Sequence, residues 1–400
     1  MLNLHSLSVV ALLALAVALG PLATDMFLPA LPGMGQDLGA GVDQMQLTLS
    51  LYLVGFALAQ LICGPLSDRF GRKPVLIGGM LLFAVASLGC AWATDIETLL
   101  LCRVLQALGG ATGPVLGRAA VRDIHTPADA ARIMAYLATI MAIAPALAPT
   151  LGSVLLEYAG WHAIFIALAV YALAAAITIA TQLPEPLRPA YRQSLRPARL
   201  WANYRDIALH PLFRGYALIG ASLYAGLFAF LSGSAFVLID DLGVSPQAYG
   251  LYFALVVAGY VIGNLGGARL SRRLNAAQLV ALGVALALSG GLSMVLLAAL
   301  GVHEPVAVIL PHTLYMIGVG LTLPQNTAAA LTPFPRMAGS ASALLGFVQM
   351  SLAAMVGALV GHFHNGTPLV MALGIAGCAL AGFATHRWMQ RAQARLALAG

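Results

Sequence analysis

Long apolar stretches, separated by short polar or glycine-containing segments, recur along the whole chain. A transmembrane helix needs about 20 mostly apolar residues to cross the hydrocarbon core of a bilayer. Turn-forming residues such as Gly33, Asp95 and Gly160 lie in the breaks between these stretches. We therefore expect an all-α membrane protein with twelve transmembrane helices. The predicted helices cover residues 7–31, 44–64, 75–94, 98–121, 132–157, 161–183, 211–239, 246–268, 277–300, 305–331, 340–363 and 367–388.

The longest polar stretch, residues 184–210, separates six predicted helices from six. Many transporters are built from two such repeats. A faint internal repeat supports this division, because the segment GPLSDRFGRKPV that starts at Gly64 is echoed by ARLSRRLNAAQLV from Ala268. The prediction is two pseudo-symmetric six-helix halves, over 1–183 and 211–400, joined by a cytoplasmic central loop over 184–210.

Composition excludes most other classes of protein. Of the 400 residues, 60% are hydrophobic and only 8% are charged, whereas a soluble domain carries about 25% charged residues. A soluble enzyme, a secreted domain and a disordered protein are thereby excluded. The four cysteines lie in apolar runs without metal-ligand spacing, which predicts small hydrophobic side chains. The sequence contains no P-loop, zinc-protease or nucleophile-elbow motif, so we expect no enzyme activity, no metal and no cofactor.

The basic residues indicate the orientation in the membrane. Of the 20 Lys and Arg residues, Arg103 and Arg118 are assigned to predicted helices, while Arg132, Arg214 and Arg387, at helix ends, are counted with the loops that they border. The other 18 lie in or beside alternate loops, whereas the opposite loops carry acidic residues. Because cytoplasmic loops are enriched in Lys and Arg, both termini and the central loop are predicted to be cytoplasmic. The net charge of +6 follows from this bias and does not indicate nucleic-acid binding. The first apolar run follows no Lys or Arg, which favours a retained helix over a signal peptide.

The loop between the second and third predicted helices carries a specific motif. Its sequence from Gly64 to Lys73 is GPLSDRFGRK, and it resembles the loop motif G-x-x-x-D-x-x-G-R-[RK] of the major facilitator superfamily. Gly71 permits a tight turn, and Asp68 is placed to pair with Arg72 or to lie near a helix N-terminus. The resemblance implies a latch on the cytoplasmic side, formed by Gly64, Asp68, Gly71, Arg72 and Lys73. The alternative is a basic loop that only fixes the orientation.

Other stretches resemble the drug/proton antiporters of that superfamily, in particular the bicyclomycin and chloramphenicol resistance (Bcr/CflA) subfamily. They include TDMFLPALP from Thr24, the run LTLSLYLVGFALAQLICG, the turn GWHAIF from Gly160, and PFPRMAGSASALLG after the tenth helix. The chain departs from the pattern at Ala107, where the family usually has Gly, and in the fifth-helix antiporter motif. Of the core of that motif, Pro149 and Gly152 remain.

Two charged residues at membrane depth are candidates for energy coupling. Asp25 lies in the first predicted helix and Arg103 in the fourth, both about 8–10 Å inside the outer boundary. Charged side chains at this depth are costly and mark functional sites. We expect Asp25 to carry the proton and Arg103 to be its electrostatic partner or a substrate ligand. The alternative is an ion pair that only orients two helices.

Further polar and aromatic residues in the predicted helices are candidates for the substrate cavity, with packing as the alternative. They are Gln106, Tyr224, Tyr252, His312 and Gln349. Pro145 and Pro149, followed by Gly152, are expected to bend the fifth helix, either for gating or for shape alone.

The sequence and its resemblance together imply proton-coupled efflux of amphiphilic antibiotics or related small molecules by alternating access. Protons, a small-molecule substrate and the lipid bilayer are the expected partners, and the expected form is a monomer in the bacterial inner membrane. The alternatives are a proton-coupled importer or exporter of an endogenous metabolite, and a receptor that no longer transports.

Overall fold

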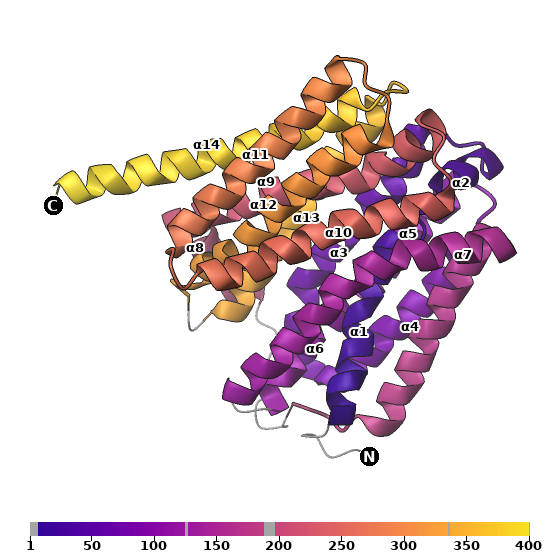
Figure 1. Ribbon diagram of the computed structural model, residues 1–400. Coiled ribbons are helices and arrows are strands. Elements are labelled where there is room, and N and C mark those ends of the chain that lie inside the picture. The colour runs from indigo at the N-terminus through magenta and orange to yellow at the C-terminus, as the bar shows by residue number, and fades with distance from the viewer. Residues whose placement is uncertain (1–6, 125–126, 188–196, 335–336, 400) are drawn as a thin grey trace. The chain divides into compact units, whose positions relative to one another are not determined.

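The computed structural model describes residues 7–124, 127–187, 197–334 and 337–399. Within these residues the structure is helical and contains no β-strand (Figure 1). The first part of the chain forms α1 (Leu7–Asp25), η1 (Leu28–Ala30), α2 (Leu31–Asp37), α3 (Val42–Phe70), α4 (Arg72–Ala91), α5 (Ile96–Gly110), α6 (Thr112–Ile124) and α7 (Pro127–Gln182). The second part forms α8 (Pro197–Leu209), α9 (Pro211–Ala235), η3 (Phe236–Asp241), α10 (Pro246–Leu270), α11 (Ala276–Ala299), α12 (Pro305–Leu331), α13 (Ala338–His362) and α14 (Leu369–Ala399).

The number of membrane crossings agrees with the sequence. In the described residues, eleven helical segments are long and apolar enough to cross a membrane. One of them, Ile143–Gln182, has 40 residues, about twice the length that one crossing needs. Its backbone breaks at Gly160, whose φ of 74° lies in the left-handed region that glycine adopts without steric cost. The predicted helices on either side of Gly160 are therefore separate crossings, and the twelve-helix all-α fold is confirmed.

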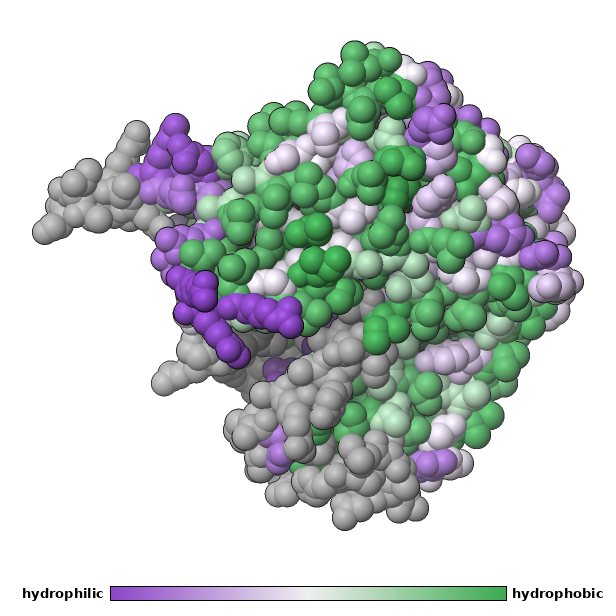
Figure 2. All heavy atoms as spheres, viewed as in Figure 1, coloured by the Kyte–Doolittle hydropathy of each residue, from purple (hydrophilic) through white to green (hydrophobic). Residues whose placement is uncertain are grey.

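Apolar side chains cover much of the outer surface, as Figure 2 shows for one face. On α3, for example, Val54, Leu58 and Ile62 recur every fourth residue with exposed fractions of 40%, 47% and 58%. Residues at this spacing form one stripe of a helix. A large exposed apolar surface of this kind indicates contact with lipid, and the protein is therefore a multi-pass membrane protein.

The chain divides into two compact units, Met1–Pro197 and Ala198–Gly400. In the first unit α1 packs against α6 and α7, and α4 packs against α5 and α7. In the second unit α9 packs against α12, α13 and α14, and α11 packs against α12 and α14. The predicted central loop over 184–210 is only partly described. Residues 188–196, with Arg188, Arg192 and Arg196, lie outside the described residues, as does Arg336, and the end of this stretch forms the helix α8.

The fourth crossing positions the candidate site of the first unit. Asp95 begins it as the N-cap of α5, accepting a hydrogen bond from the Thr98 amide at 2.8 Å, which lowers the pKa of the Asp95 carboxyl. The crossing continues as α6 after Gly110. A Cβ on Gly113 of α6 would lie 1.9 Å from the carbonyl oxygen of Ala16. This glycine therefore lets α6 contact the backbone of α1, and it serves close packing.

Candidate functional site

Arg103 lies at the centre of the first unit and is fully buried on α5. Its Nη1 donates to the carbonyl oxygen of Ala23 at 3.0 Å and to Gln106 Oε1 at 2.6 Å, and its Nε donates to the carbonyl oxygen of Thr48 at 3.3 Å. The guanidinium thus joins the backbones of α1 and α3 to α5. Because a guanidinium keeps its charge in proteins, these contacts hold a permanent cation inside the first unit.

Two aromatic rings complete the surroundings of the Arg103 guanidinium. Its central carbon lies 4.2 Å from the ring centroid of Phe27 and 4.4 Å from that of Tyr52. Aromatic faces attract a cation within about 6 Å, most strongly where water is excluded. In the described part of the chain, Arg103 Nη2 has no hydrogen-bond partner. The Arg103 cation is therefore stabilised by carbonyl dipoles and aromatic rings, and its Nη2 donor lacks an acceptor among the described residues.

A chain of buried hydrogen bonds continues from Arg103 across α5 to α4. Gln106 accepts from Arg103 and donates from Nε2 to Ser87 Oγ at 2.7 Å, and the Ser87 hydroxyl donates to the carbonyl oxygen of Phe83, also at 2.7 Å. All three polar side chains have an exposed fraction of 0%. Satisfied polar networks of this kind fix side-chain positions in a low-dielectric interior, and this network fixes Gln106 next to Arg103.

Asp25 is the last residue of α1 and is 3% exposed. Its Oδ1 has no hydrogen-bond partner in the described residues, and no ion pair joins it to Arg103. Ala23 and Phe27, two residues before and two residues after Asp25, both contact the Arg103 guanidinium. The direct pair that the sequence allowed is therefore not formed in this structure, because the guanidinium is directed to backbone carbonyls and aromatic rings instead.

Of the predicted bend residues of α7, Gly152 lies close to this site. A Cβ on Gly152 would lie 1.7 Å from the carbonyl oxygen of Met26, the residue after Asp25. A side chain at this position would therefore push α7 away from the end of α1. The helix continues through Pro145 and Pro149, and the one position with non-helical backbone angles in α7 is Gly160. The break in the helix thus lies beyond the prolines.

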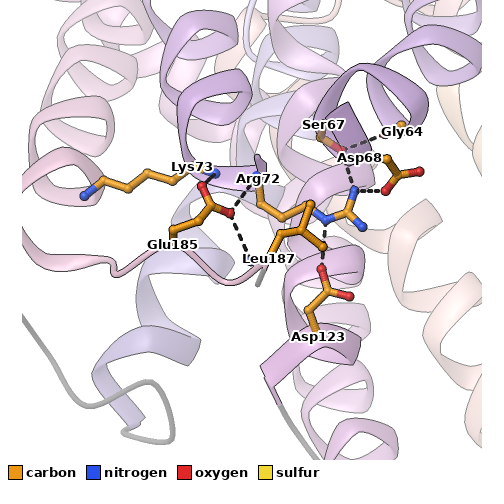
Figure 3. Close-up of polar contacts among 8 residues, drawn as sticks. All are labelled: Gly64, Ser67, Asp68, Arg72, Lys73, Asp123, Glu185 and Leu187. Carbon is orange, nitrogen blue, oxygen red and sulfur yellow. Dashed lines mark hydrogen bonds and ion pairs between the residues drawn. The ribbon is translucent and has the colours of Figure 1, made fainter. Parts of the chain in front are cut away.

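The loop motif forms an ion-pair cluster at the junction of α3 and α4 (Figure 3). Arg72 Nη1 lies 2.6 Å from Asp68 Oδ1, and Arg72 Nε lies 2.8 Å from Asp123 Oδ2 at the end of α6. Arg72 Nη1 also donates to Ser67 Oγ at 2.5 Å. Gly71, between the two helices, has a φ of 104°, which an L-side chain rarely adopts. The pairing of Asp68 with Arg72 that the motif suggested is present.

A carboxylate from a distant part of the chain completes the cluster. Glu185, three residues after the end of α7, accepts hydrogen bonds from the backbone amides of Arg72 at 2.8 Å and Lys73 at 3.2 Å. These amides are the first of α4 and have no partner within the helix. Figure 3 shows the Lys73 side chain pointing away from this group. Lys73 therefore contributes its backbone amide, and Gly64 contributes a carbonyl that accepts from Ser67 at 2.7 Å.

The second unit holds a different kind of cluster around His312, which is fully buried on α12. The imidazole stacks on Phe230 with centroids 3.9 Å apart and on Tyr315 at 5.3 Å, with interplanar angles of 12° and 10°. Neither ring nitrogen of His312 has a hydrogen-bond partner in the described residues. Tyr315 donates to the carbonyl oxygen of Leu223 at 2.7 Å. His312 therefore belongs to a buried aromatic stack rather than to a polar network.

The other predicted residues of the second unit do not all join this stack. The amide of Gln349 lies near Gly220 and Asn326, and Gly220 is ten residues before Phe230, or about 15 Å along α9. Tyr224 packs against Phe228 with centroids 4.9 Å apart. On α10, the buried ring near Phe230 is that of Phe253, with centroids 6.3 Å apart, whereas Tyr252 is half-buried.

Sequence reasoning missed several residues that these clusters use. Tyr52, Ser87, Asp123 and Glu185 each contact a predicted site residue. For Tyr52 and Ser87 a signal existed, since both are polar groups inside apolar helices. Asp123 and Glu185 lie in polar stretches, where a carboxylate is ordinary and its partner is set by the fold.

Helices that cross a membrane twelve times and hold buried polar sites in their interior define a multi-pass membrane transporter rather than an enzyme. The chain belongs to the Major Facilitator Superfamily, whose family model matches residues 13–358. The crystal structure of a D-xylose-proton symporter has a TM-score of 0.74 and 16% identity, over 96% of this chain and 97% of its own. At this identity the likeness shows the fold alone.

Bacterial relatives agree with the family. The uncharacterized MFS-type transporter YdgK of Bacillus subtilis (strain 168) is 36% identical over 88% of this chain and 87% of its own. The bicyclomycin resistance protein homolog of Haemophilus influenzae is 27% identical over 90% of both chains. A chloramphenicol resistance protein of Pseudomonas aeruginosa is 31% identical over 86% of this chain and 81% of its own. The resemblance to this subfamily is confirmed.

Proposed function

We propose that this transporter is a proton-coupled antiporter that expels amphiphilic small molecules across the bacterial inner membrane by alternating access. The observation that carries the proposal is the buried pair of unlike charges, Asp25 and Arg103, which lie in one site without a direct ion pair. Relatives named for bicyclomycin and chloramphenicol resistance support the direction and the substrate class. A monomer with both termini in the cytoplasm, and two six-helix halves, are parts of the same proposal.

In this mechanism Asp25 is the group that gains and loses the proton. A buried carboxylate oxygen without a hydrogen-bond partner is costly while it is charged. Access to water, or the arrival of a proton, removes this cost. The Arg103 cation is held by Ala23, Thr48 and Gln106, so it stays in place while the charge on Asp25 changes. In this proposal the net charge of the site therefore changes with the protonation of Asp25 alone.

The proton gradient is sufficient to drive the efflux. One charge that crosses a potential of 100 mV releases about 2.3 kcal/mol. This free energy supports a roughly fifty-fold concentration gradient of a neutral substrate.

We further propose that the cluster of Gly64, Asp68, Gly71, Arg72 and Lys73 latches the cytoplasmic side. Gln106, Tyr224, Tyr252, His312 and Gln349 are proposed to line the substrate path, and Pro145, Pro149 and Gly152 to shape the helix beside Asp25.

The test compares Asp25→Asn with a matched control, Asp43→Asn, whose carboxylate is exposed at the start of α3. A pH gradient, acidic inside, is established across everted membrane vesicles, and the uptake of radiolabelled chloramphenicol into them is measured. We expect Asp25→Asn to lose gradient-driven uptake while the purified variant keeps its size-exclusion profile and its helical circular dichroism. Asp43→Asn is expected to transport at the wild-type rate. Wild-type rates in Asp25→Asn would exclude Asp25 as the proton carrier.

A further inference from the structure

Two of the four cysteines lie together beside the buried cation of the first unit. Cys90, on the last turn of α4, and Cys102, on α5, lie close enough for their thiols to interact. Both are free thiols. A Cβ on Gly89 would lie 2.6 Å from Cys102 Sγ, so the missing side chain of this glycine admits the Cys102 sulfur against α4. We propose that Cys90 and Cys102 form a thiol pair that closes reversibly into a disulfide.

The alignment of α4 and α5 fixes this pair in register. One turn before Cys90, Ser87 accepts a hydrogen bond from Gln106, which lies one turn after Cys102. One helical turn further from the cysteines on both helices, a Cβ on Gly109 of α5 would lie 2.6 Å from the backbone nitrogen of Phe83 of α4. Three successive contacts thus hold the antiparallel helices together. The two sulfurs meet because of this register and not through the chance rotation of one side chain.

Their exposure assigns different roles to the two sulfurs. Cys90 is fully buried, whereas Cys102 is half-buried. A small external disulfide therefore reaches Cys102 first. The Cys102 sulfur attacks it, forming a mixed disulfide and releasing one thiol. The Cys90 sulfur then attacks Cys102 Sγ and releases the second thiol. Both thiol protons leave, two electrons pass to the external disulfide, and one S–S bond of about 2.05 Å remains between α4 and α5.

The closed pair would act on the site described above, since Cys102 directly precedes Arg103. Drawing Cys102 toward α4 moves the backbone of Arg103 relative to the carbonyls of Ala23 and Thr48, which its guanidinium binds. This consequence for transport rests on the proposed function, whereas formation of the disulfide does not.

The chemical test uses the purified full-length protein with Cys63 and Cys378 replaced by serine, and 4,4′-dithiodipyridine as the external disulfide. We expect release of two equivalents of 4-thiopyridone and an intact mass that is lower by two hydrogen atoms, with no adduct. Cys90→Ser in this background should release one equivalent and keep the pyridyl adduct on Cys102. Cys102→Ser should react several-fold more slowly, because the buried Cys90 is left alone. Retained adducts on the two-cysteine protein, or no reaction, would overturn the proposal.

The functional test treats vesicles with the same reagent and then with dithiothreitol. We expect the transport rate of the two-cysteine protein to fall several-fold and to recover on reduction, while Cys102→Ser keeps its own untreated rate. An unchanged rate despite complete disulfide formation would contradict the link to Arg103. A second result would be a disulfide in a protein whose untreated form transports no tested substrate under a pH gradient. That result would support the thiol pair and contradict the proposed function.

Discussion

The clusters around Arg103 and His312 each bury a polar side chain, but they surround it with different chemical groups. Both place a polar side chain with an exposed fraction of 0% inside a compact unit. Arg103 meets carbonyl oxygens, an amide and two aromatic faces. His312 stacks on two rings, and its two nitrogens have no hydrogen-bond partner in the described residues.

This difference indicates what each cluster can do. A permanent cation held by fixed dipoles gives the first unit a strong and constant electrostatic field near Asp25. A stack of flat rings gives the second unit a neutral, mostly apolar cluster, which is fully buried in this structure, and apolar and aromatic side chains are the usual lining of a site for drug-like molecules. Under the proposed function, energy coupling belongs to the first unit and apolar substrate contact to the second. Two substitutions test this contrast, and a third tests a cluster outside both buried sites.

The largest effect is expected for Arg103→Lys, which keeps the charge. An ammonium lacks the planar fork of a guanidinium, so it cannot bind Ala23, Thr48 and Gln106 together while stacking between two rings. Each lost hydrogen bond to a charged group costs about 1.5–3 kcal/mol of stability, and because several are lost together at the centre of the proposed coupling site, we expect gradient-driven transport to be nearly abolished. Transport in everted vesicles measures it, with the exposed Arg69→Lys as control. Wild-type transport would mean that charge alone suffices at position 103.

A smaller effect is expected for His312→Phe, because the phenyl ring keeps the stack on Phe230 and Tyr315 and removes two unpartnered nitrogens. Replacing a polar group by an apolar one of similar shape is nearly neutral when that group had no partner. We expect an unchanged or slightly higher melting temperature, and proton-driven transport within a few-fold of wild type. His312→Ala is the contrasting variant, since it opens a cavity that costs about 2–5 kcal/mol. Loss of proton coupling in His312→Phe would show that the second unit also carries coupling.

The sequence predicted the parts of this structure that depend on local patterns. Apolar length fixed the crossings, and Gly160 was recognised as the turn between two of them. The pairing of Asp68 with Arg72 was within reach because the residues are one helical turn apart in a single motif.

Contacts between distant segments were out of reach of the sequence for definite physical reasons. Arg103 binds the carbonyl oxygens of Ala23 and Thr48, and every residue has a carbonyl, so no sequence signal marks these two. The expected partner of Arg103 was Asp25, because opposite charges at equal depth attract. The structure shows that backbone dipoles and rings can take the place of the carboxylate. The fold was thus predictable, whereas the hydrogen-bond partners of the candidate residues were set by packing.

The smallest effect is expected for Glu185→Gln, which tests the third polar cluster of the chain, outside both buried sites. Its carboxylate accepts from the first amides of α4, where a negative charge is stabilised by about 0.3–1 kcal/mol through the helix dipole. The amide of glutamine keeps one acceptor oxygen but loses the charge. We expect a melting temperature lower by about one degree and a transport rate closer to wild type than those of His312→Phe and Arg103→Lys. The matched control is Glu304→Gln, directly before α12, whose carboxylate is exposed and makes no capping hydrogen bond. A larger transport defect in Glu185→Gln than in Arg103→Lys would reverse the assignment, because the junction of α3 and α4 would then limit the cycle more than the buried cation does.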